Sequence, residues 1–376
     1  MTQVFVVNSG SSSIKYQLID VESAVSVLSG SVERIGEPGH PINHTEGVRD
    51  VLASLGDNHE IAAVGHRVVH GGSLFAEATL ITPVVEKAID DLSALAPLHN
   101  PANLLGIRAA REALPDVPHV AVFDTAFHQS MPAEAFTYAI DRELAAKHGV
   151  RRYGFHGTSH KYVSEQAAAF LGQPLERLKL IVLHLGNGAS ITAIDGGKSV
   201  DTSMGLTPLQ GLVMGTRSGD IDPAVLTHLH RVAGLGFDEL DDLLNKKSGL
   251  LGLTGSGDMR DVQKAAADGD EAALAALAVW RHRIKHYVGA YIAQLGGVDA
   301  IIFTAGVGEN NALLRRRALA GLEFLGIEID DDRNELLSRE ERRISRDGSG
   351  VEVLVIPTNE ELEIARQALA LVGAAR

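Results

Sequence analysis

The sequence VFVVNSGSSSIKYQ, residues 4–17, decides how this chain folds. Its apolar run stops at Asn8, a turn of small residues follows at 10–13, and alternation resumes from Ile14. This pattern predicts two strands joined by a tight turn that carries serine hydroxyls, backbone N–H groups and Lys15. Such donors suit phosphate oxygens, although an ordinary serine-rich hairpin explains the stretch equally well on its own. It is no Walker A loop, because a strand follows the turn where that motif has a helix.

Two further apolar runs end in glycine-rich turns. Residues 180–185 lead into Gly186–Ser190 and a second alternating stretch, whereas residues 300–303 lead into Thr304–Asn310 and then a helical pattern. Three buried strands that end in this way predict several loops converging on one anionic ligand. The first two segments indicate one structural unit used twice.

Length and composition limit the classes of protein to which this chain can belong. The chain has 376 residues, enough for two domains, with 22% charged and 45% hydrophobic residues, as in ordinary globular proteins. No run approaches the roughly 20 apolar residues that span a bilayer, and the first residues show no signal segment. Cysteine is absent, which excludes disulfides and thiolate chemistry, and the net charge of −14 argues against a nucleic-acid partner. We therefore expect a cytoplasmic protein whose anion site is built from a few local cations.

Two strand ends carry charged candidates. Residues 63–72 are predicted to form a strand that ends in paired glycines. Arg67 lies among apolar neighbours on this strand, so it is either a ligand-binding residue or a solvated residue at the edge of a sheet. The strand 119–123 ends at Asp124, a position typical of catalytic or metal-contacting carboxylates but also of helix caps. Helices are expected at 84–96, at 101–113 with Asn100 as N-cap, and at 271–295 as the longest of the chain.

Later segments add polar candidates. His156 and His160 are four residues apart, but the glutamate of a zinc-binding H-E-x-x-H motif is absent, so we expect His156 to donate a hydrogen bond to a ligand. The long segment 201–222 carries one cation, Arg217, and has too many apolar residues for a flexible linker. Glu360, after the strand 351–356, is either a carboxylate at a helix N-terminus or a metal ligand.

In nine ordered segments along nearly its whole length, the sequence resembles the acetate kinases, the acetokinase family of short-chain acid kinases. The matching segments are Asn8–Ser13 with Lys15, Gly65–Gly72, Phe123–His128, Tyr153–His160, His184–Gly188, Asp201–Gly205, Thr216–Gly219, Thr304–Asn310 and Pro357–Glu361. The resemblance implies an α/β protein with the duplicated fold shared by actin, sugar kinases and chaperone ATPases. It implies two domains with an interdomain active-site cleft: an acyl- and phosphate-binding domain at 1–126 plus 361–376, and a nucleotide-binding domain at 127–360.

The resemblance also implies a homodimer and the reaction ATP + acetate ⇌ ADP + acetyl phosphate, with Mg²⁺, or Mn²⁺ in its place. It assigns Asn8 and Glu360 to the metal, and Asp124, His156 and Arg217 to catalysis. The residues implied for acetate are Arg67, Val69, Leu98, Phe155 and Pro208. Those implied for the nucleotide are Ser11, Ser13, Lys15, His184, Leu185, Gly186, Asn187, Gly188, Asp258, Met259, Arg260, Gly306, Val307, Gly308, Glu309 and Asn310.

Physical chemistry agrees with these roles. Acetate should have a pKa of about 4–5, like Asp and Glu, and is already ionised at neutral pH, so no general base is needed. We therefore expect Asp124 to orient Mg²⁺ or its water. Met259 stands where the family often has phenylalanine, and a methionine can still pack against a base. Two alternatives are a propionate or butyrate kinase on the same scaffold, and a non-enzymatic actin- or chaperone-like ATP-binding scaffold.

Overall fold

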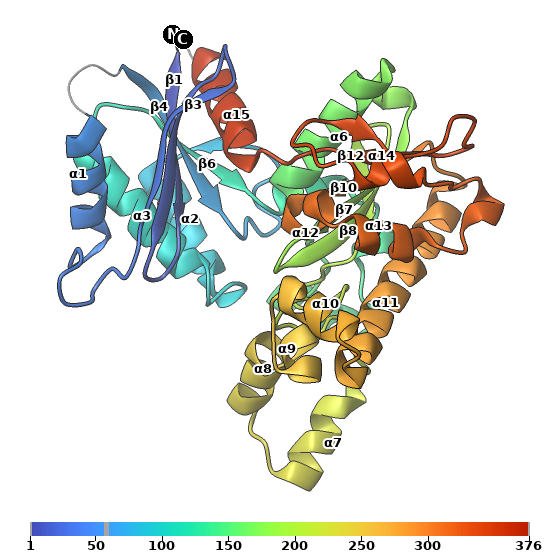
Figure 1. The fold of residues 1–376 in the computed structure, drawn as a ribbon. Coiled ribbons are helices and arrows are strands. Elements are labelled where there is room, and N and C mark those ends of the chain that lie inside the picture. Colours follow the sequence, from blue (N-terminus) through green and yellow to red (C-terminus); the bar gives the residue numbers. More distant parts are fainter. Residues whose placement is uncertain (1, 56–59, 375–376) are drawn as a thin grey trace. The chain divides into compact units, whose positions relative to one another are not determined.

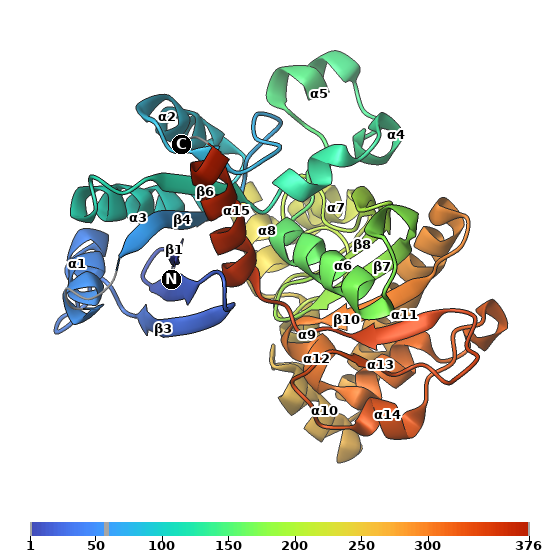
Figure 2. The same cartoon turned by 90° about the horizontal axis from the view of Figure 1, so that it is seen from above.

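The computed structural model describes residues 2–55 and 60–374, which form two compact units. The first unit comprises Met1–Gln129, Phe155–Tyr162 and Asn359–Arg376, and the second comprises Ser130–Gly154 and Val163–Thr358. Figures 1 and 2 show the elements of each unit from two directions. No helix among the described residues is long and apolar enough to cross a membrane.

The first unit is built on a six-stranded sheet in the order β3-β2-β1-β4-β6-β5. Its strands are β1 (Gln3–Ser9), β2 (Ile14–Asp20), β3 (Val25–Val32), β4 (Ile61–Val68), β5 (Thr79–Leu80) and β6 (His119–Phe123). Strands β1, β2 and β3 form an antiparallel meander, and the predicted hairpin pairs Ser9 with Ile14 across its turn. Strands β4 and β6 run parallel to β1, so their carboxyl ends meet at the same edge of the sheet.

Helices cover both faces of this sheet. The helices of this unit are α1 (His44–Leu55), α2 (Pro83–Asp91), α3 (Asn100–Ala113) and α15 (Glu360–Ala374), and the start of α6 (Gly157–Leu171) also belongs to it. Successive strand residues face opposite sides, so Val64 packs in the core beside Ala109 and Ala110 of α3 while Gly65 faces α15. A Cβ at Gly65 would lie 2.6 Å from Ile364 Cγ2, so glycine allows α15 its close approach to β4. Figure 2 shows α3 and α15 on opposite sides of β4.

The second unit repeats this topology. Its sheet has the order β11-β12-β10-β7-β8-β9, with β7 (Lys179–Leu185), β8 (Ala189–Asp195), β9 (Lys198–Thr202), β10 (Ala300–Thr304), β11 (Arg342–Arg343) and β12 (Glu352–Val355). Strands β7, β8 and β9 form the antiparallel meander, β10 and β12 run parallel to β7, and β11 is antiparallel to β12. Each strand therefore has a counterpart in the other sheet, which confirms the predicted duplication.

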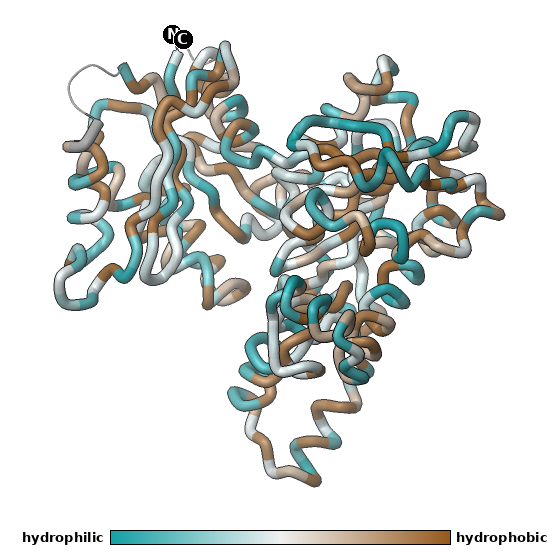
Figure 3. The backbone as a smooth tube through the Cα atoms, in the orientation of Figure 1, coloured by the Kyte–Doolittle hydropathy of each residue, from teal (hydrophilic) through white to brown (hydrophobic). Residues whose placement is uncertain are grey.

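The second unit contains helices of different lengths. They are α4 (Ala133–Phe136), α5 (Arg142–His148), most of α6, α7 (Ala224–Ala233), α8 (Phe237–Lys246), α9 (Gly249–Thr254), α10 (Met259–Ala267), α11 (Glu271–Leu295), α12 (Ala305–Asn310), α13 (Ala312–Leu319) and α14 (Asp331–Glu335). The predicted bounds of α11, the longest described helix, are confirmed. Asp270 caps it by accepting a hydrogen bond from Ala273 N, and Gly296 ends it with φ of 65°. Along the helices of Figure 3, hydrophobic and hydrophilic residues alternate, as expected of elements with one buried face.

One predicted helix cap is wrong. Asn100 is the first residue of α3, the N-cap is His99, and the Asn100 side chain is fully buried. Its amide instead accepts a hydrogen bond from His70 N and donates one to His70 O. The loop after β4 needs buried partners for its backbone, and this tertiary requirement overrides the local capping preference.

Candidate active site

The turn between β1 and β2 presents the predicted phosphate donors. Gly10 N donates to Ser13 O over 2.8 Å, which closes a tight turn, and Asn8 is the strand partner of Lys15. Ser11 and Lys15 are exposed and Ser13 is half-buried. The hydroxyls and the ammonium group are therefore accessible to an anion.

Arg67 and Asp124, which lie at the ends of the adjacent strands β4 and β6, form a bidentate ion pair. Arg67 Nε lies 3.0 Å from Asp124 Oδ1, and Arg67 Nη2 lies 2.6 Å from Asp124 Oδ2. The Asp124 side chain is 3% exposed and that of Arg67 is 21% exposed. Sequence reasoning predicted both residues but not their direct contact.

The charges around this pair set its protonation. Burial works against the charged form of Arg67, but Asp124 and Glu360 together raise the pKa of Arg67 above its ordinary value. Glu360 Oε2 lies 4.0 Å from Arg67 Nε. Burial raises the pKa of Asp124, while the Arg67 guanidinium opposes that shift. A carboxylate that accepts two hydrogen bonds from one guanidinium is held in its ionised form, so Asp124 is unsuited to be a proton acceptor.

His99 is a neighbour of this pair that the sequence analysis missed. It precedes α3, and its charge lowers the pKa of Asp124. The only sequence signal was its position between Leu98, which the resemblance assigned to the acyl site, and the helix start at Asn-Pro.

His156 is held beside Asp124 by the backbone. Gly157 N donates to Asp124 O over 2.8 Å, and a Cβ at Gly157 would lie 2.3 Å from that oxygen, so no side chain fits there. His156 adopts φ of 57°, a conformation that is uncommon for residues other than glycine and is found at functional sites. The start of α6 thus brings His156 close to the β6 end.

The predicted acyl-site residues come from both units. Val69 is half-buried, Leu98 is 55% exposed and Phe155 is 1% exposed, and all three belong to the first unit. Phe155 packs edge-on against the His70 ring, with centroids 5.4 Å apart. Pro208 belongs to the second unit, where its carbonyl accepts a hydrogen bond from Arg217 Nη1 over 3.1 Å.

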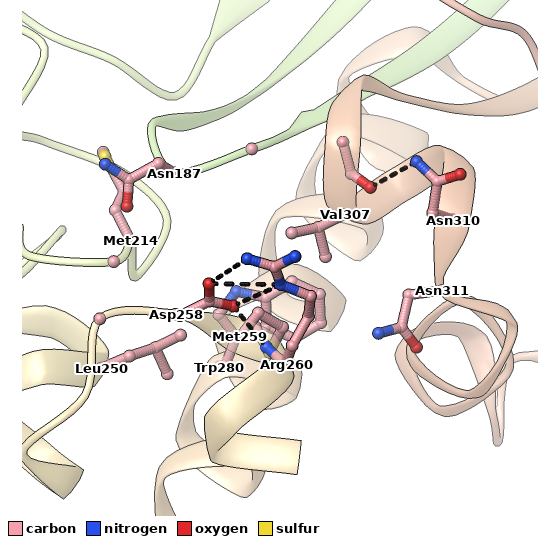
Figure 4. A pocket seen from close by; sticks show the side chains of 14 residues that line it. Asn187, Met214, Leu250, Asp258, Met259, Arg260, Trp280, Val307, Asn310 and Asn311 are labelled. Atoms are coloured by element: carbon pink, nitrogen blue, oxygen red, sulfur yellow. Dashed lines mark hydrogen bonds and ion pairs between the residues drawn. The ribbon is translucent and has the colours of Figure 1, made fainter. Parts of the chain in front are cut away.

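The second unit contains a cavity of about 620 Å³ (Figure 4). The β7–β8 turn, the start of α10, α11 and α12 contribute to its wall. Predicted residues in the lining are Gly186, Asn187, Asp258, Met259, Arg260, Gly306, Val307 and Asn310. Residues that sequence reasoning missed are Met214, Gly215, Leu250, Gly257, Trp280 and Asn311. Trp280 is the single tryptophan of the chain and lies in the middle of α11, where nothing local distinguishes it from a core residue.

Other predicted nucleotide residues lie outside the lining of this cavity. They are His184, Leu185, Gly188, Gly308 and Glu309 in the second unit, and Ser11, Ser13 and Lys15 in the first. The carboxylate of Glu309 accepts hydrogen bonds from Ala305 N over 2.7 Å and from Thr358 N over 3.1 Å. Glu309 therefore holds the start of α12 against the segment after β12.

Asp258 and Arg260 form an ion pair at the cavity, which Figure 4 shows beside Met259. Asp258 caps α10 by accepting a hydrogen bond from Arg260 N, and Arg260 Nη2 lies 2.6 Å from Asp258 Oδ2. Hydrogen bonds from the Arg260 side chain and backbone lower the pKa of Asp258 to about 2. The Arg260 side chain is 88% exposed and so can move to meet a ligand.

Arg217 differs from Arg67 in having neutral partners. Within the described part of the chain, its guanidinium contacts Pro208 O and, at 3.9 Å, Met214 Sδ. Burial lowers its pKa from the ordinary value. Asp220 anchors this loop because it accepts hydrogen bonds from Gly211 N and from the Tyr287 hydroxyl.

Comparison with known proteins gives one consistent result. The model of the acetokinase family matches residues 3–366. The chain is 66% identical to the acetate kinase of Clavibacter michiganensis subsp. michiganensis, over 98% of this chain and 99% of that protein.

Solved structures agree with this match. The crystal structure of Porphyromonas gingivalis acetate kinase superposes with a TM-score of 0.95 at 44% identity, covering 99% of this chain and all of that one. A propionate kinase from Francisella tularensis superposes with a TM-score of 0.93, also at 44% identity, covering 98% of this chain and all of that one. These likenesses confirm the predicted two-domain α/β fold, and the chain belongs to the acetokinase family.

Proposed function

We propose that this protein is an acetate kinase, a phosphotransferase that moves the γ-phosphoryl group of ATP reversibly to acetate. The observation that carries the proposal is the Arg67 guanidinium near the end of β4, two residues before Val69. Nε and Nη2 of Arg67 bind Asp124, whereas Nη1 donates to no protein atom among the described residues. A cationic fork with a free edge next to apolar side chains fits a small carboxylate.

The acceptor needs positioning rather than deprotonation. Acetate is already ionised at neutral pH, and Asp124 is engaged by Arg67, so no side chain has to remove a proton. The difficulty is the approach of one anion to another, and phosphoryl transfer relies on in-line positioning and charge neutralisation. In this proposal Arg67 holds the acetate carboxylate, and Val69, Leu98, Phe155 and Pro208 enclose its methyl group.

Three further cations would act on the phosphoryl group. Lys15, with the hydroxyls of Ser11 and Ser13, would bind the phosphate chain. His156 and Arg217 would stabilise the equatorial oxygens in the transition state. Arg217 suits this role because, among the described residues, its guanidinium has neutral partners that leave its charge uncompensated.

A divalent cation fits the donors of the first unit. Asn8 and Glu360 offer amide and carboxylate oxygens, the ligands that Mg²⁺ and Mn²⁺ prefer, and Asp124 would orient a metal-bound water. The described residues contain no group of three or more His, Asp or Glu side chains arranged for a metal. A cation held by one or two protein ligands and the nucleotide phosphates is the usual arrangement for Mg²⁺. When bound, it would neutralise charge on the β- and γ-phosphates.

The nucleotide would occupy the cavity of the second unit. In this assignment Met259 and Val307 pack against the base, while the glycines at 186 and 306 let the backbone approach the ligand. Glu309 and Gly308 would act through α12, whose first turn Glu309 holds. Binding of ADP or ATP should change the fluorescence of Trp280, which gives a measurement independent of turnover.

The direct test is ATP- and acetate-dependent formation of acetyl phosphate, trapped as the hydroxamate with hydroxylamine. We expect hydroxamate from the purified protein with ATP, Mg²⁺ and acetate. If nucleotide changes the Trp280 fluorescence but no acyl phosphate forms with any short-chain acid, the non-enzymatic ATP-binding scaffold is the correct function.

A propionate or butyrate kinase is the second candidate, because a propionate kinase superposes on the chain with a TM-score of 0.93. The branched Val69 favours the smaller acid. One methylene is worth only about 1–3 kcal/mol of discrimination, so overlapping activity is expected. The ratio of kcat/KM values for acetate, propionate and butyrate decides between these acids.

A homodimer in the cytoplasm completes the proposal. No residue of α7 is buried, and Val225, Val232 and Phe237 expose 39%, 66% and 83% of their surface along and just after this helix. A second copy would cover this apolar surface. Light scattering should give twice the monomer mass for the wild type. The variant Val232→Asp should have a lower mass in solution, and an unchanged mass would exclude α7 from the interface.

A further inference from the structure

The first half of helix α3 carries two buried asparagines and a glycine on one face. Asn100, Asn103 and Gly106 are spaced three residues apart, so they lie along the same side of the helix. Asn100 is 0% exposed and Asn103 is 5% exposed. A buried amide is costly unless both its ends are hydrogen-bonded, and both amides meet this requirement.

Asn103 bridges the ends of two strands. Its Oδ1 accepts a hydrogen bond from Val69 N over 3.0 Å, and its Nδ2 donates to Ser9 O over 2.9 Å. Ser9 is the last residue of β1, directly before the serine-rich turn, and Val69 is the first residue after β4. The pairing of β1 with β4 ends at Val7 and His66. Beyond that point the Asn103 amide links the segments that follow the two strands.

Asn100 makes contacts of a different kind. Its amide binds His70 N over 3.1 Å and His70 O over 3.0 Å, so it fixes the segment after β4. Among the described residues, its side-chain hydrogen bonds go to His70 and Ile89 and not to the β1–β2 hairpin. Asn100 is therefore a natural comparison for Asn103, on the same helix and with the same side chain.

Gly106 lets α3 reach the end of β1. A Cβ at this position would lie 1.9 Å from Ser9 Oγ and 2.6 Å from Ser9 Cβ, so any side chain would push the helix away from the strand. This close packing brings the start of α3 to the strand ends. The position of Asn103 is thus fixed by the helix and not by its own rotamer alone.

We propose that Asn103 is a positioning residue that couples the phosphate-binding hairpin to the acetate-binding end of β4. The proposal rests on the function proposed above, which places Lys15 on one of these segments and Arg67 and Val69 on the other. Through a single amide, Asn103 sets the distance between the group that holds the phosphate chain and the groups that hold acetate. Loss of the bridge should lower the rate of transfer more than the binding of either substrate.

The variant Asn103→Asp separates the two halves of the bridge. It keeps the acceptor for Val69 N but places an oxygen against Ser9 O, so contact with the hairpin is lost while contact with β4 persists. We expect kcat to fall about 10–100-fold and the KM for acetate to change less than about 5-fold. ADP binding, followed by Trp280 fluorescence, should be unchanged because the cavity lies in the second unit.

A double-mutant cycle tests the coupling itself. If Asn103 acts through the hairpin, Lys15→Ala should reduce kcat by a smaller factor in the Asn103→Asp background than in the wild type. The same cycle with Asn100→Ala should be additive. Kinetics are compared well below the unfolding temperature of each variant. Additivity for Asn103, or an unchanged kcat in folded Asn103→Asp, would overturn the proposal.

Hydrogen exchange without substrates keeps the test independent of activity. Asn103→Asp should speed amide exchange in residues 9–13, whereas Asn100→Ala should speed it only in residues 69–72. Unchanged exchange in the hairpin overturns the coupling. If the wild type forms no acyl phosphate but the exchange pattern holds, the proposed function fails while the bridge between the two segments stands.

Discussion

The two sheets have the same strand order, but the carboxyl ends of their central parallel strands carry different chemistry. In the first unit, β4 and β6 end in a buried ion pair between Arg67 and Asp124. At the corresponding place in the second unit, β10 ends in Thr304 and continues into α12, whose Gly306 lines a large cavity. The topology supplies the position, and the side chains decide whether an ion pair or a cavity occupies it.

The two hairpin turns differ in the same way. Gly10 N donates to Ser13 O, and Gly186 N donates to Gly188 O, so both turns are closed by a glycine N–H. The first turn exposes serine hydroxyls beside Lys15, whereas the second contributes Gly186 and Asn187 to the cavity wall. The same backbone hydrogen bond thus closes a turn with exposed hydroxyls in one unit and a turn that lines a cavity in the other.

The two arginines extend this comparison. Arg67 is paired with a buried carboxylate, which raises its pKa, whereas Arg217 has neutral partners and burial lowers its pKa. In the proposed function, the paired arginine binds acetate, and the other stabilises the charge of the transferring phosphoryl group. The following experiments break or sharpen these contrasts.

The largest effect is expected for Arg217→Ala. Loss of an arginine that contacts the transferring group should reduce kcat by about 10³-fold, with little change in the KM for acetate. Stability should not fall, because no buried carboxylate loses its partner. Steady-state kinetics and urea unfolding measure both quantities, and Arg217→Lys is the control that keeps charge without the planar fork. If the Arg217→Ala variant keeps full activity, Arg217 has no role in the mechanism.

For Arg67→Ala we expect the effect on the KM for acetate and on stability rather than on kcat. The KM for acetate should rise by about 10²-fold through loss of a charge-assisted contact. Unfolding stability should also fall by about 3 kcal/mol, because Asp124 is left buried without its partner.

The matched control for this variant is Arg67→Ala combined with Asp124→Asn. It should recover most of the stability but not the acetate affinity. If the single variant binds acetate as tightly as the wild type, Arg67 is not the acetate ligand.

A smaller effect, confined to the nucleotide, should follow Gly215→Ala. A Cβ there would lie 2.0 Å from Asn187 Oδ1 and 2.9 Å from Gly257 O, so the cavity wall has to shift. We expect the KM for ATP to rise by about 10-fold without a change for acetate, because a shifted wall costs on the order of 1 kcal/mol. Titration of Trp280 fluorescence with ADP checks this.

Gly289→Ala is the control, because nothing lies within 4 Å of a Cβ at this helical position. It should leave the kinetics unchanged and stabilise the protein by about 0.5–1 kcal/mol. Equal effects of the two substitutions on ATP would show that the wall at Gly215 is not specific to the nucleotide.

The smallest effect concerns acid stability in the first unit. His66 Nε2 lies 2.9 Å from His119 Nδ1, and His66 is 2% exposed. Burial, with His119 and Arg111, lowers the pKa of His66 well below its ordinary 6.5, and burial also lowers that of His119.

Below pH 6.5 the two histidines bind protons in the unfolded chain but stay neutral in the folded protein. The free energy of unfolding should therefore fall as the pH drops below 6.5. The loss is at most about 1.4 kcal/mol per pH unit for each histidine. Urea unfolding at pH 7.0 and 5.5 measures it, and a midpoint that does not fall on acidification would contradict the neutral pair.

Much of the fold could be predicted from local patterns. The hairpins, the strand before α12 and the bounds of α11 follow from hydrophobic periodicity and glycine placement, which act within a few residues. The capping role predicted for Asn100 failed, because a loop distant in sequence uses its amide. The motif residues of the candidate site could be named from the sequence, but their partners could not. Nothing local indicates that Arg67 forms an ion pair with Asp124, or that the Glu309 carboxylate accepts a hydrogen bond from Ala305 N at the start of α12.

The sequence by itself determined the strand–turn–strand units, their repetition and the residue types available for an anion, because these depend on short-range sterics and side-chain chemistry. Only the tertiary structure decided that, among the described residues, Arg67 forms an ion pair and Arg217 does not, that Trp280 and Gly215 line the cavity of the second unit, and that Asn103 spans two strand ends. Those outcomes depend on which distant backbone groups must find buried partners, and that is settled when the sheets and helices pack.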